Sequence, residues 1–117
     1  MVSTTAKIEG GSLVIEPKGK WSKFASLRRK VTVPLRAITS VSTARAKIKE
    51  LKLAGTNLSP HFAGEFYDFK DGRIFYMLSN TDRCVTLKVH GFKYSEVVVQ
   101  VDDKEAVAGM IRKSLHR

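Results

Sequence analysis

The stretch "GEFYDFKDGRIFYML", residues 64–78, decides how this chain folds. Two runs rich in aromatic residues flank the dipeptide Asp71-Gly72. A tight hairpin needs backbone with positive φ, which glycine adopts without steric cost and aspartate tolerates. Six of the ten aromatic residues of the chain lie between Phe62 and Tyr76. We therefore expect a β-hairpin here that supplies much of the hydrophobic core.

Two valine-rich runs follow, "CVTLKVH" (residues 84–90) and "SEVVVQV" (residues 95–101). Apolar and polar residues alternate along both, which is typical of strands that bury one face. Gly91 to Tyr94 join the two runs, so we expect a second hairpin. The alternation turns Cys84 to the opposite face, where a half-buried thiol is expected. The residues expected to face the core are Val85, Leu87, Val89, Val97, Val99 and Val101.

Strand signals also dominate the first part of the chain. The runs "TAKIEG" and "SLVIEP" meet at Gly10 and Gly11 and predict another hairpin. In "KVTVPLRAITSV", Val31, Val33 and Leu35 occupy alternate positions and predict one buried face. A proline within this run cannot donate a hydrogen bond to a neighbouring strand. The strand is therefore predicted to be a sheet edge or to bend there.

The middle of the chain is less definite. Over residues 42–53, Ala44, Ile48 and Leu51 fit one stripe of a short helix, and an extended loop fits nearly as well. The following "AGTNLSPHFAG" (residues 54–64) brings Gly, Asn, Ser and Pro close together, so we expect a loop.

The period changes from two to that of a helix in "DDKEAVAGMIRKSLHR" (residues 102–117). Asp102 followed three residues later by Glu105 resembles a capping box, with aspartate as the N-cap. We expect one amphipathic helix. Its apolar face would consist of Ala106, Val107, Met110, Ile111 and Leu115.

These elements predict a mainly β single domain spanning residues 1–117. About seven antiparallel strands in so short a chain form either a small barrel or two packed sheets. The C-terminal helix would cover an open end or an exposed seam. With one cysteine, the chain cannot form an internal disulfide.

The order of these stretches resembles the bacterial pleckstrin-homology-like (PH-like) domains from about Ala6 to Lys113. The stretches that carry it are "LVIEP", "SLRRKVTVPLRAITSV", "LAGTNLSPHFAGEFY", "GRIFYML" and the last valine strand with its helix. The resemblance implies a seven-stranded barrel of two near-orthogonal sheets, plugged at one end by the helix. It implies little about activity, although PH-like folds serve as binding platforms for inositol lipids, peptides and proteins. Where the family usually has Pro-Gly, this chain has Ser59-Pro60-His61, so the turn there is expected to differ.

Charge is the most unusual bulk property, with 21 basic against 11 acidic residues and a formal net charge of +10. Such an excess attracts polyanions, although it can also serve solubility alone. The densest basic run surrounds "GKWSKFASLRRK" (residues 19–30). It is either a docking surface for an anionic ligand or membrane, or a solvated connection with Trp21 and Phe24 packed inward. The candidate residues for the docking surface are Lys18, Lys20, Trp21, Lys23, Arg28, Arg29 and Lys30.

No catalytic signature is present. The spacing of His61, His90 and His116 matches no metal motif, and no glycine-rich phosphate loop precedes a helix. The carboxylates fall in expected turns and at the helix cap, where they serve structure. Arg83 beside Cys84 would point to the opposite face of a strand and not activate the thiol. We expect a non-enzyme without a cofactor or metal.

Two function classes remain open. The first is an interaction module for a protein or peptide partner, including self-association, with Val31, Val33 and Leu35 on the edge that accepts a partner strand. The alternative is peripheral binding to an anionic membrane through the basic residues 18–30. Nucleic acid is not favoured, because no recognition helix or exposed aromatic pair is predicted. No run approaches the roughly 20 apolar residues of a transmembrane span, and a cytoplasmic location is expected.

Overall fold

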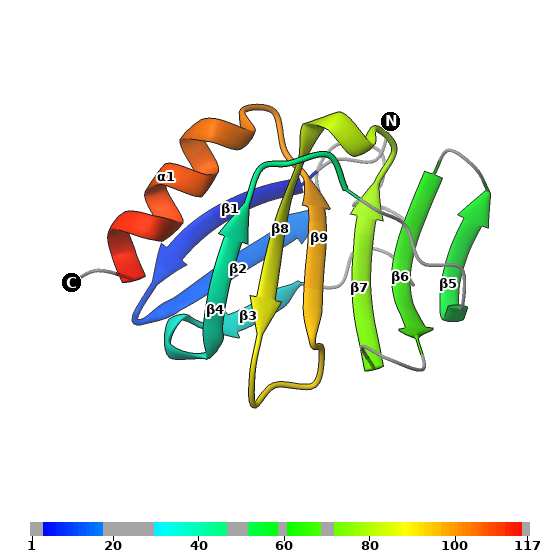
Figure 1. Cartoon of the computed structure of the whole chain (residues 1–117), viewed down its shortest axis with the longest axis horizontal. Helices are drawn as coiled ribbons and strands as arrows, with labels where there is room; N and C mark the ends of the chain where they lie inside the picture. Colours follow the sequence, from blue (N-terminus) through cyan, green and yellow to red (C-terminus); the bar gives the residue numbers. More distant parts are fainter. Residues whose placement is uncertain (1–3, 18–29, 47–51, 59–60, 69–71, 116–117) are drawn as a thin grey trace.

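Two β-sheets and one helix make up the part of the chain that the computed structural model describes, residues 4–17, 30–46, 52–58, 61–68 and 72–115 (Figure 1). For residues 52–58 and 61–68 the description covers the backbone. The smaller sheet is antiparallel and contains, in spatial order, β1 (Thr4–Glu9), β2 (Ser12–Pro17) and β3 (Val31–Pro34). The larger sheet contains, in spatial order, β4 (Ile38–Ser42), β8 (Cys84–Val89), β9 (Glu96–Gln100), β7 (Gly72–Leu78), β6 (His61–Asp68) and β5 (Lys52–Leu58).

The predicted hairpins are confirmed. β6 and β7 pair antiparallel, with Phe66 opposite Ile74, and Gly72 has a φ of +80°. β1 and β2 meet at Gly10 and Gly11, whose φ values of +52° and +82° are the two positive values that a type I′ turn requires. β8 and β9 form the valine hairpin. Within the larger sheet, β7 and β9 are the one parallel pair, so the sheet is not the all-antiparallel one predicted.

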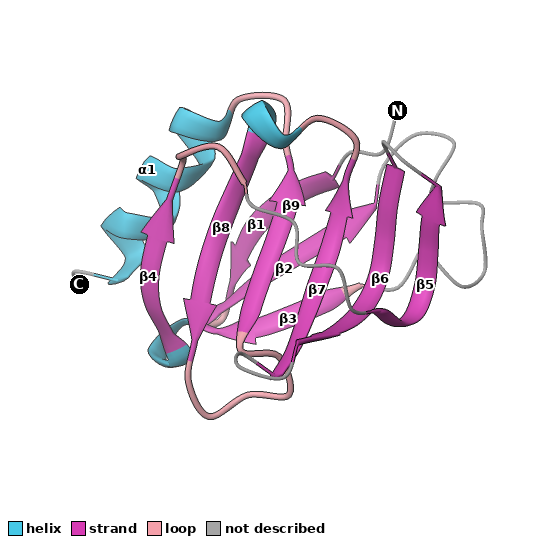
Figure 2. Ribbon diagram, turned by 45° about the vertical axis from the view of Figure 1, so that its right-hand side comes forward, coloured by secondary structure: helices cyan, strands magenta, loops and turns pink. Residues whose placement is uncertain are grey.

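The two packed sheets are as predicted, but they do not close into the predicted barrel. The described residues hold nine strands in two separate sheets that face each other (Figure 2). The chain changes sheets after Pro34, where a 3-10 turn, η2 (Leu35–Ala37), leads into β4. Proline has no N–H to continue a ladder, so the run that begins as β3 bends at this residue. The bend was one of the two outcomes predicted for it.

The main core lies between the two sheets and α1 (Lys104–Leu115). It includes every core residue predicted on β8 and β9, together with Leu13, Ile15, Val31 and Val33 of the smaller sheet. The helix packs along the side where β1 and β4 diverge, so it covers the opening between the sheets (Figure 1). The mainly β architecture with one terminal helix is therefore as predicted.

Two predicted elements need correction. The expected loop over residues 54–64 is instead mostly β5 and β6, joined by the two residues 59–60. Glycine and asparagine disfavour strands on their own, but pairing with a neighbouring strand outweighs such weak preferences. The helix is capped by Asp103, not Asp102, because its carboxylate accepts a hydrogen bond of 3.1 Å from Ala106 N. Ala106 is consequently exposed rather than part of the apolar face.

A second apolar cluster covers the outer face of the larger sheet, the face turned away from the smaller sheet. Its members are Ala46, Ile74, Tyr76, Leu78, Cys84 and Val98. Ala46 is held there because its N–H donates to the carbonyl of Thr81, at 3.0 Å, in the 3-10 turn η3 (Thr81–Arg83). The central strands are thus buried on both faces, which the simple alternation in the sequence did not predict.

Gln100, 1% exposed, is the buried polar side chain that joins these parts. Its Oε1 accepts hydrogen bonds of 2.7 Å from the N–H groups of both Ser79 and Asn80, where the chain leaves β7. Its backbone carbonyl accepts a 2.9 Å hydrogen bond from Thr4 Oγ1 on the smaller sheet. One residue therefore fixes both the connection from β7 to β8 and the contact between the sheets.

We expect Gln100→Leu to lower the free energy of unfolding by about 1–3 kcal/mol, because two part-buried N–H groups lose their acceptor. Urea denaturation monitored by circular dichroism measures the change. Ser40→Ala on the exposed face of β4 is the control and should cost less than about 0.5 kcal/mol. An equal effect of both substitutions would contradict the role of Gln100.

Candidate functional site

The basic stretch predicted as a docking surface falls largely outside the described residues. Lys18, Lys20, Trp21, Lys23, Arg28 and Arg29 all lie there. Lys30 is described and is exposed at the start of β3. The prediction for this stretch therefore stays a prediction.

The predicted partner edge is placed on β3, but its side chains serve the core. Val31 and Val33 are buried between the sheets, and Leu35 packs against the same core from η2. Leu35 N donates to Gly11 O at 3.0 Å, so by alternation the N–H groups of residues 31 and 33 also point toward β2. Thr32 and Pro34 then face the open edge, and proline offers no donor there.

Four exposed basic residues belong to one end of the larger sheet: Arg36 in η2, Lys88 near the end of β8, and His90 and Lys93 in the loop between β8 and β9, which lies below these strands in Figure 1. We call this set the cationic end; it consists of Arg36, Lys88, His90 and Lys93. A hydrogen bond of 2.8 Å from His90 N to Ala37 O brings the loop after β8 beside η2. Arg36 and His90, far apart in sequence, are neighbours for this reason.

Arg36, Lys88 and Lys93 form no ion pair with any residue that the structure describes. Lys93 lies 5.3 Å from the ring centroid of Tyr94, a cation–π contact that leaves its charge uncompensated. By contrast, Lys7 pairs with Glu9 at 2.9 Å. Their hydrogen bond raises the pKa of Lys7 and lowers the pKa of Glu9. The cationic end therefore presents positive charge that the described chain does not neutralise.

A pocket of about 260 Å³ opens on the outer face of the larger sheet, beside the cationic end. Lys88 belongs to both features. The other lining residues are Ser42, Ala44, Arg45, Ala46, Thr86, Glu96 and Val98. Cross-strand pairing places Ser42 opposite Thr86 and Lys88 opposite Glu96, so hydroxyl and charged groups share this face. We call it the outer-face pocket.

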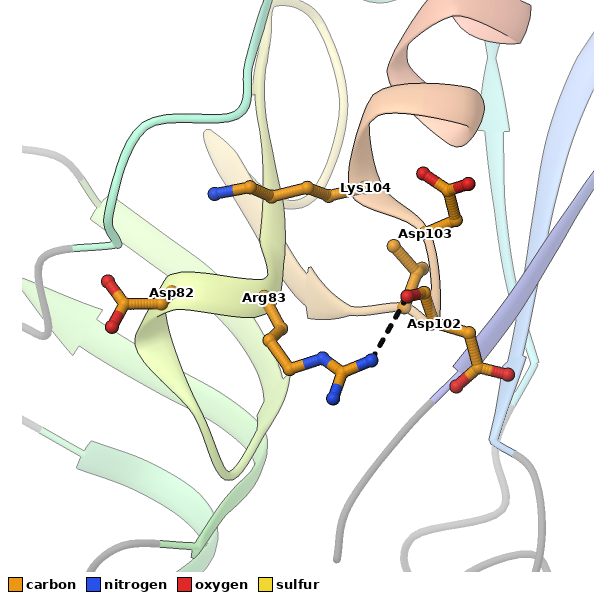
Figure 3. Close-up of a pocket in the computed structure, with 6 residues that line it drawn as sticks. Asp82, Arg83, Asp102, Asp103 and Lys104 are labelled. Carbon is orange, nitrogen blue, oxygen red and sulfur yellow. Dashed lines mark hydrogen bonds between the residues drawn. The ribbon is translucent and has the colours of Figure 1, made fainter.

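A second pocket, of about 240 Å³, lies where β9 leads into α1 (Figure 3). Arg83 donates a 3.1 Å hydrogen bond to the carbonyl of Asp102, and Asp103 caps the helix. Lys104 Nζ donates to Thr43 O at 2.8 Å. These polar groups hold the start of α1 in place, so the pocket is accounted for by the fold.

Cys84 is fully buried in the outer cluster rather than half-buried as predicted. Its Sγ donates to Asn80 O at 3.3 Å. Burial raises the pKa of the Cys84 thiol to about 12, against which the nearby charge of Lys104 acts only in part. The thiolate that nucleophilic chemistry requires is therefore scarce at neutral pH.

Within the described ranges, no three His, Cys, Asp or Glu side chains lie close enough to hold a metal ion. No described helix is long and apolar enough to cross a membrane.

Sequence reasoning missed the cationic end and the outer-face pocket. Their residues come from η2, β4, β8, β9 and two loops, and only the sheet order brings them together. The one available signal was the alternation in "CVTLKVH", which turns Lys88 and His90 away from the core. Comparisons with protein-family models, curated proteins and solved structures gave no match for this chain.

We expect stability at alkaline pH to depend on Cys84. The thiol ionises near pH 9.0 in the unfolded chain and near pH 12 when folded, so its contribution is complete below pH 9.0 and falls as the pH rises toward 12. Between these two pH values, the Cys84 thiol should lower the free energy of unfolding by about 1.4 kcal/mol for each pH unit. Urea denaturation across this range should show a steeper decline for the wild type than for Cys84→Ala. Parallel curves would contradict the assignment.

Proposed function

We propose that this chain is a non-catalytic interaction module that accepts a strand from a protein or peptide partner along the open edge of β5. The observation that carries the proposal is a difference among the four sheet edges. β1, β3 and β4 each carry a feature that obstructs strand addition, whereas the described residues show none at β5.

The β4 edge is covered by α1. Arg112 donates a 3.0 Å hydrogen bond to Val41 O, and Lys104 donates to Thr43 O. These carbonyls at the end of β4 already have partners, and the helix lies against the strand. A partner strand would have to displace the helix and both hydrogen bonds.

The smaller sheet offers two poorer edges. β1 contacts α1 and carries a lysine, Lys7, which is a residue that natural proteins place on edges to prevent pairing. β3 has only four residues and presents Pro34 toward its open side. The strand addition predicted at Val31, Val33 and Leu35 is therefore less favourable than addition at β5.

β5 is longer, with seven residues, and β6 is its one partner in the sheet. Leu58 pairs with His61, and two residues join these strands. In a hairpin with a two-residue loop, the closing pair is the hydrogen-bonded one and hydrogen-bonded pairs alternate along the strands. This register implies that the backbone N–H groups of Gly55 and Asn57 face the open edge. Lys52 is the single charged residue of the strand. Antiparallel pairing of two β5 strands about Gly55 would place Lys52 opposite Leu58 of the copy, so like charges would not meet.

The PH-like relationship is part of this proposal. The mainly β chain and its terminal helix support it, and the parallel pair of β7 and β9 departs from the antiparallel barrel that the family implies. The non-enzymatic assignment rests on two observations: Cys84 is buried, and the polar groups of the pocket between β9 and α1 hold the start of the helix.

We expect Asn57→Pro to weaken association of two copies by about tenfold or more, because one edge donor is lost on each strand. Sedimentation velocity over a concentration series measures this. The matched variant Thr56→Pro removes a donor that faces β6 and should instead destabilise the fold.

Association of two copies should strengthen with salt, since two chains of charge +10 repel each other. A strict monomer at the highest soluble concentration would remove the self-association form of the proposal.

The alternative function is peripheral binding to an anionic membrane through residues 18–30, supported by their sequence and by the net charge. At about 1 kcal/mol for each basic residue near the surface, binding should be measurable and should fall steeply with salt. We expect replacement of Arg28 and Arg29 by glutamine to reduce co-sedimentation with phosphatidylserine vesicles, and Trp21→Ala to shorten residence. Unchanged sedimentation of both variants would rule out this stretch as the site.

A further inference from the structure

We propose that the cationic end and the outer-face pocket together form a docking site for an acidic peptide segment. This site is separate from the β5 edge and goes beyond strand addition. The two features form one surface because Lys88, near the end of β8, lines the pocket and belongs to the cationic end. Its cross-strand neighbours are Ser40 on β4 and Glu96 on β9.

Charge defines the ligand class. Arg36, Lys88 and Lys93 are exposed and form no ion pair within the described chain, so a bound carboxylate would not have to displace an internal partner. His90 lies in the same loop as Lys93, between β8 and β9. Arg45, on the far side of the pocket, is already paired with Asp82 at 3.3 Å. An acidic segment would therefore place its carboxylates at the cationic end and its chain in the pocket.

The shape favours a peptide over a bilayer. The pocket is a hollow of about 260 Å³, which a chain segment can enter and a flat membrane surface cannot. Thr86 supplies a hydroxyl group to hydrogen-bond a backbone, and the side chain of Val98 supplies an apolar floor. Ser42 Oγ accepts a 3.1 Å hydrogen bond from Ala44 N and keeps its O–H to donate.

The aromatic residues beside the cationic end do not provide a membrane anchor. Phe92 is half-buried, packs against the core and contacts Tyr94 edge-on, with ring centroids 5.8 Å apart. Tyr94 is fully buried. Stacking of nucleic-acid bases would likewise need an exposed ring, and neither of these two supplies one.

Glu96 gives the proposal a test with a distinctive sign. Its carboxylate is the acidic group among the lining residues, directly across the strand pair from Lys88, and it repels an acidic ligand. Glu96→Gln should therefore tighten binding of an acidic peptide, by roughly twofold to fivefold, the range of a single exposed charge interaction.

The experiment measures fluorescence anisotropy of fluorescein-labelled hexaglutamate against the full chain at near-physiological salt. The double variant Arg36→Gln/Lys93→Gln should weaken binding by roughly fivefold or more. The matched control is Lys7→Gln/Lys30→Gln, which removes two exposed charges on or beside the smaller sheet and should change affinity less than twofold, or about 0.4 kcal/mol. Circular dichroism verifies that these surface variants fold.

The outcomes separate the possible partners. Weaker hexaglutamate binding by Arg36→Gln/Lys93→Gln, together with tighter binding by Glu96→Gln, supports the acidic-peptide site. Equal losses with both double variants would show attraction to net charge alone and overturn it. Binding of the chain to phosphatidylserine vesicles that depends on Arg36 and Lys93, without binding to hexaglutamate, would reassign the surface to membranes. None of these results bears on association through β5, which Asn57→Pro tests independently.

Discussion

The position of β9 between β7 and β8 is the constraint on which the rest of the structure depends. A strand parallel to β7 cannot follow it directly, so the chain must leave β7, turn through η3, run back as β8 and return. Gln100, at the end of β9, accepts the hydrogen bonds of the two residues that begin this detour. Thr4 then ties the smaller sheet to the same residue. The stacking of the two sheets and the path of the chain between them thus meet at one buried residue, which uses its side-chain carboxamide for the chain path and its backbone carbonyl for the contact between the sheets.

Burial of the central strands on both faces determines where a partner can bind. The core covers the inner face, and the cluster around Tyr76 covers much of the outer face. The surfaces left for recognition are the sheet edges, the loop ends and the part of the outer face near β4 and β8. The two proposals use these places: one uses backbone groups of an edge, and the other uses side chains at an end. They also respond to salt in opposite directions, because one brings like charges together and the other brings opposite charges together.

Local pattern in the sequence was enough for the elements with strong alternation or periodicity. The hairpins around Gly10 and Gly72, the inward valines of β8 and β9, and the terminal helix could all be predicted from neighbouring residues. β5 could not, because its residues have weak strand preferences and it forms by pairing with β6. The parallel pairing of β7 and β9 depends on contacts between distant segments.

The candidate sites were even less accessible to sequence reasoning. A run of basic residues is visible in the sequence, whereas the cationic end unites residues 36 to 93 through a backbone contact between Ala37 and His90. The shift of the helix cap from Asp102 to Asp103 shows a related limit. Asp102 matches the capping-box spacing with Glu105, but Asp103 accepts the hydrogen bond from Ala106 N, so the geometry of the incoming chain decides the cap and not the sequence pattern.

The central place of β9 also has a consequence for biosynthesis. A ribosome makes this strand after all the others, yet it pairs with two of them and fills the middle of the larger sheet. Until β9 emerges, β7 and β8 each lack a neighbour, and their apolar residues lack a core to enter. Nascent chains halted before residue 96 would hold the β1–β2 and β6–β7 hairpins without a closed sheet, a state with exposed strand edges that chaperones recognise. Completion of the larger sheet is therefore coupled to the synthesis of residues 96–100.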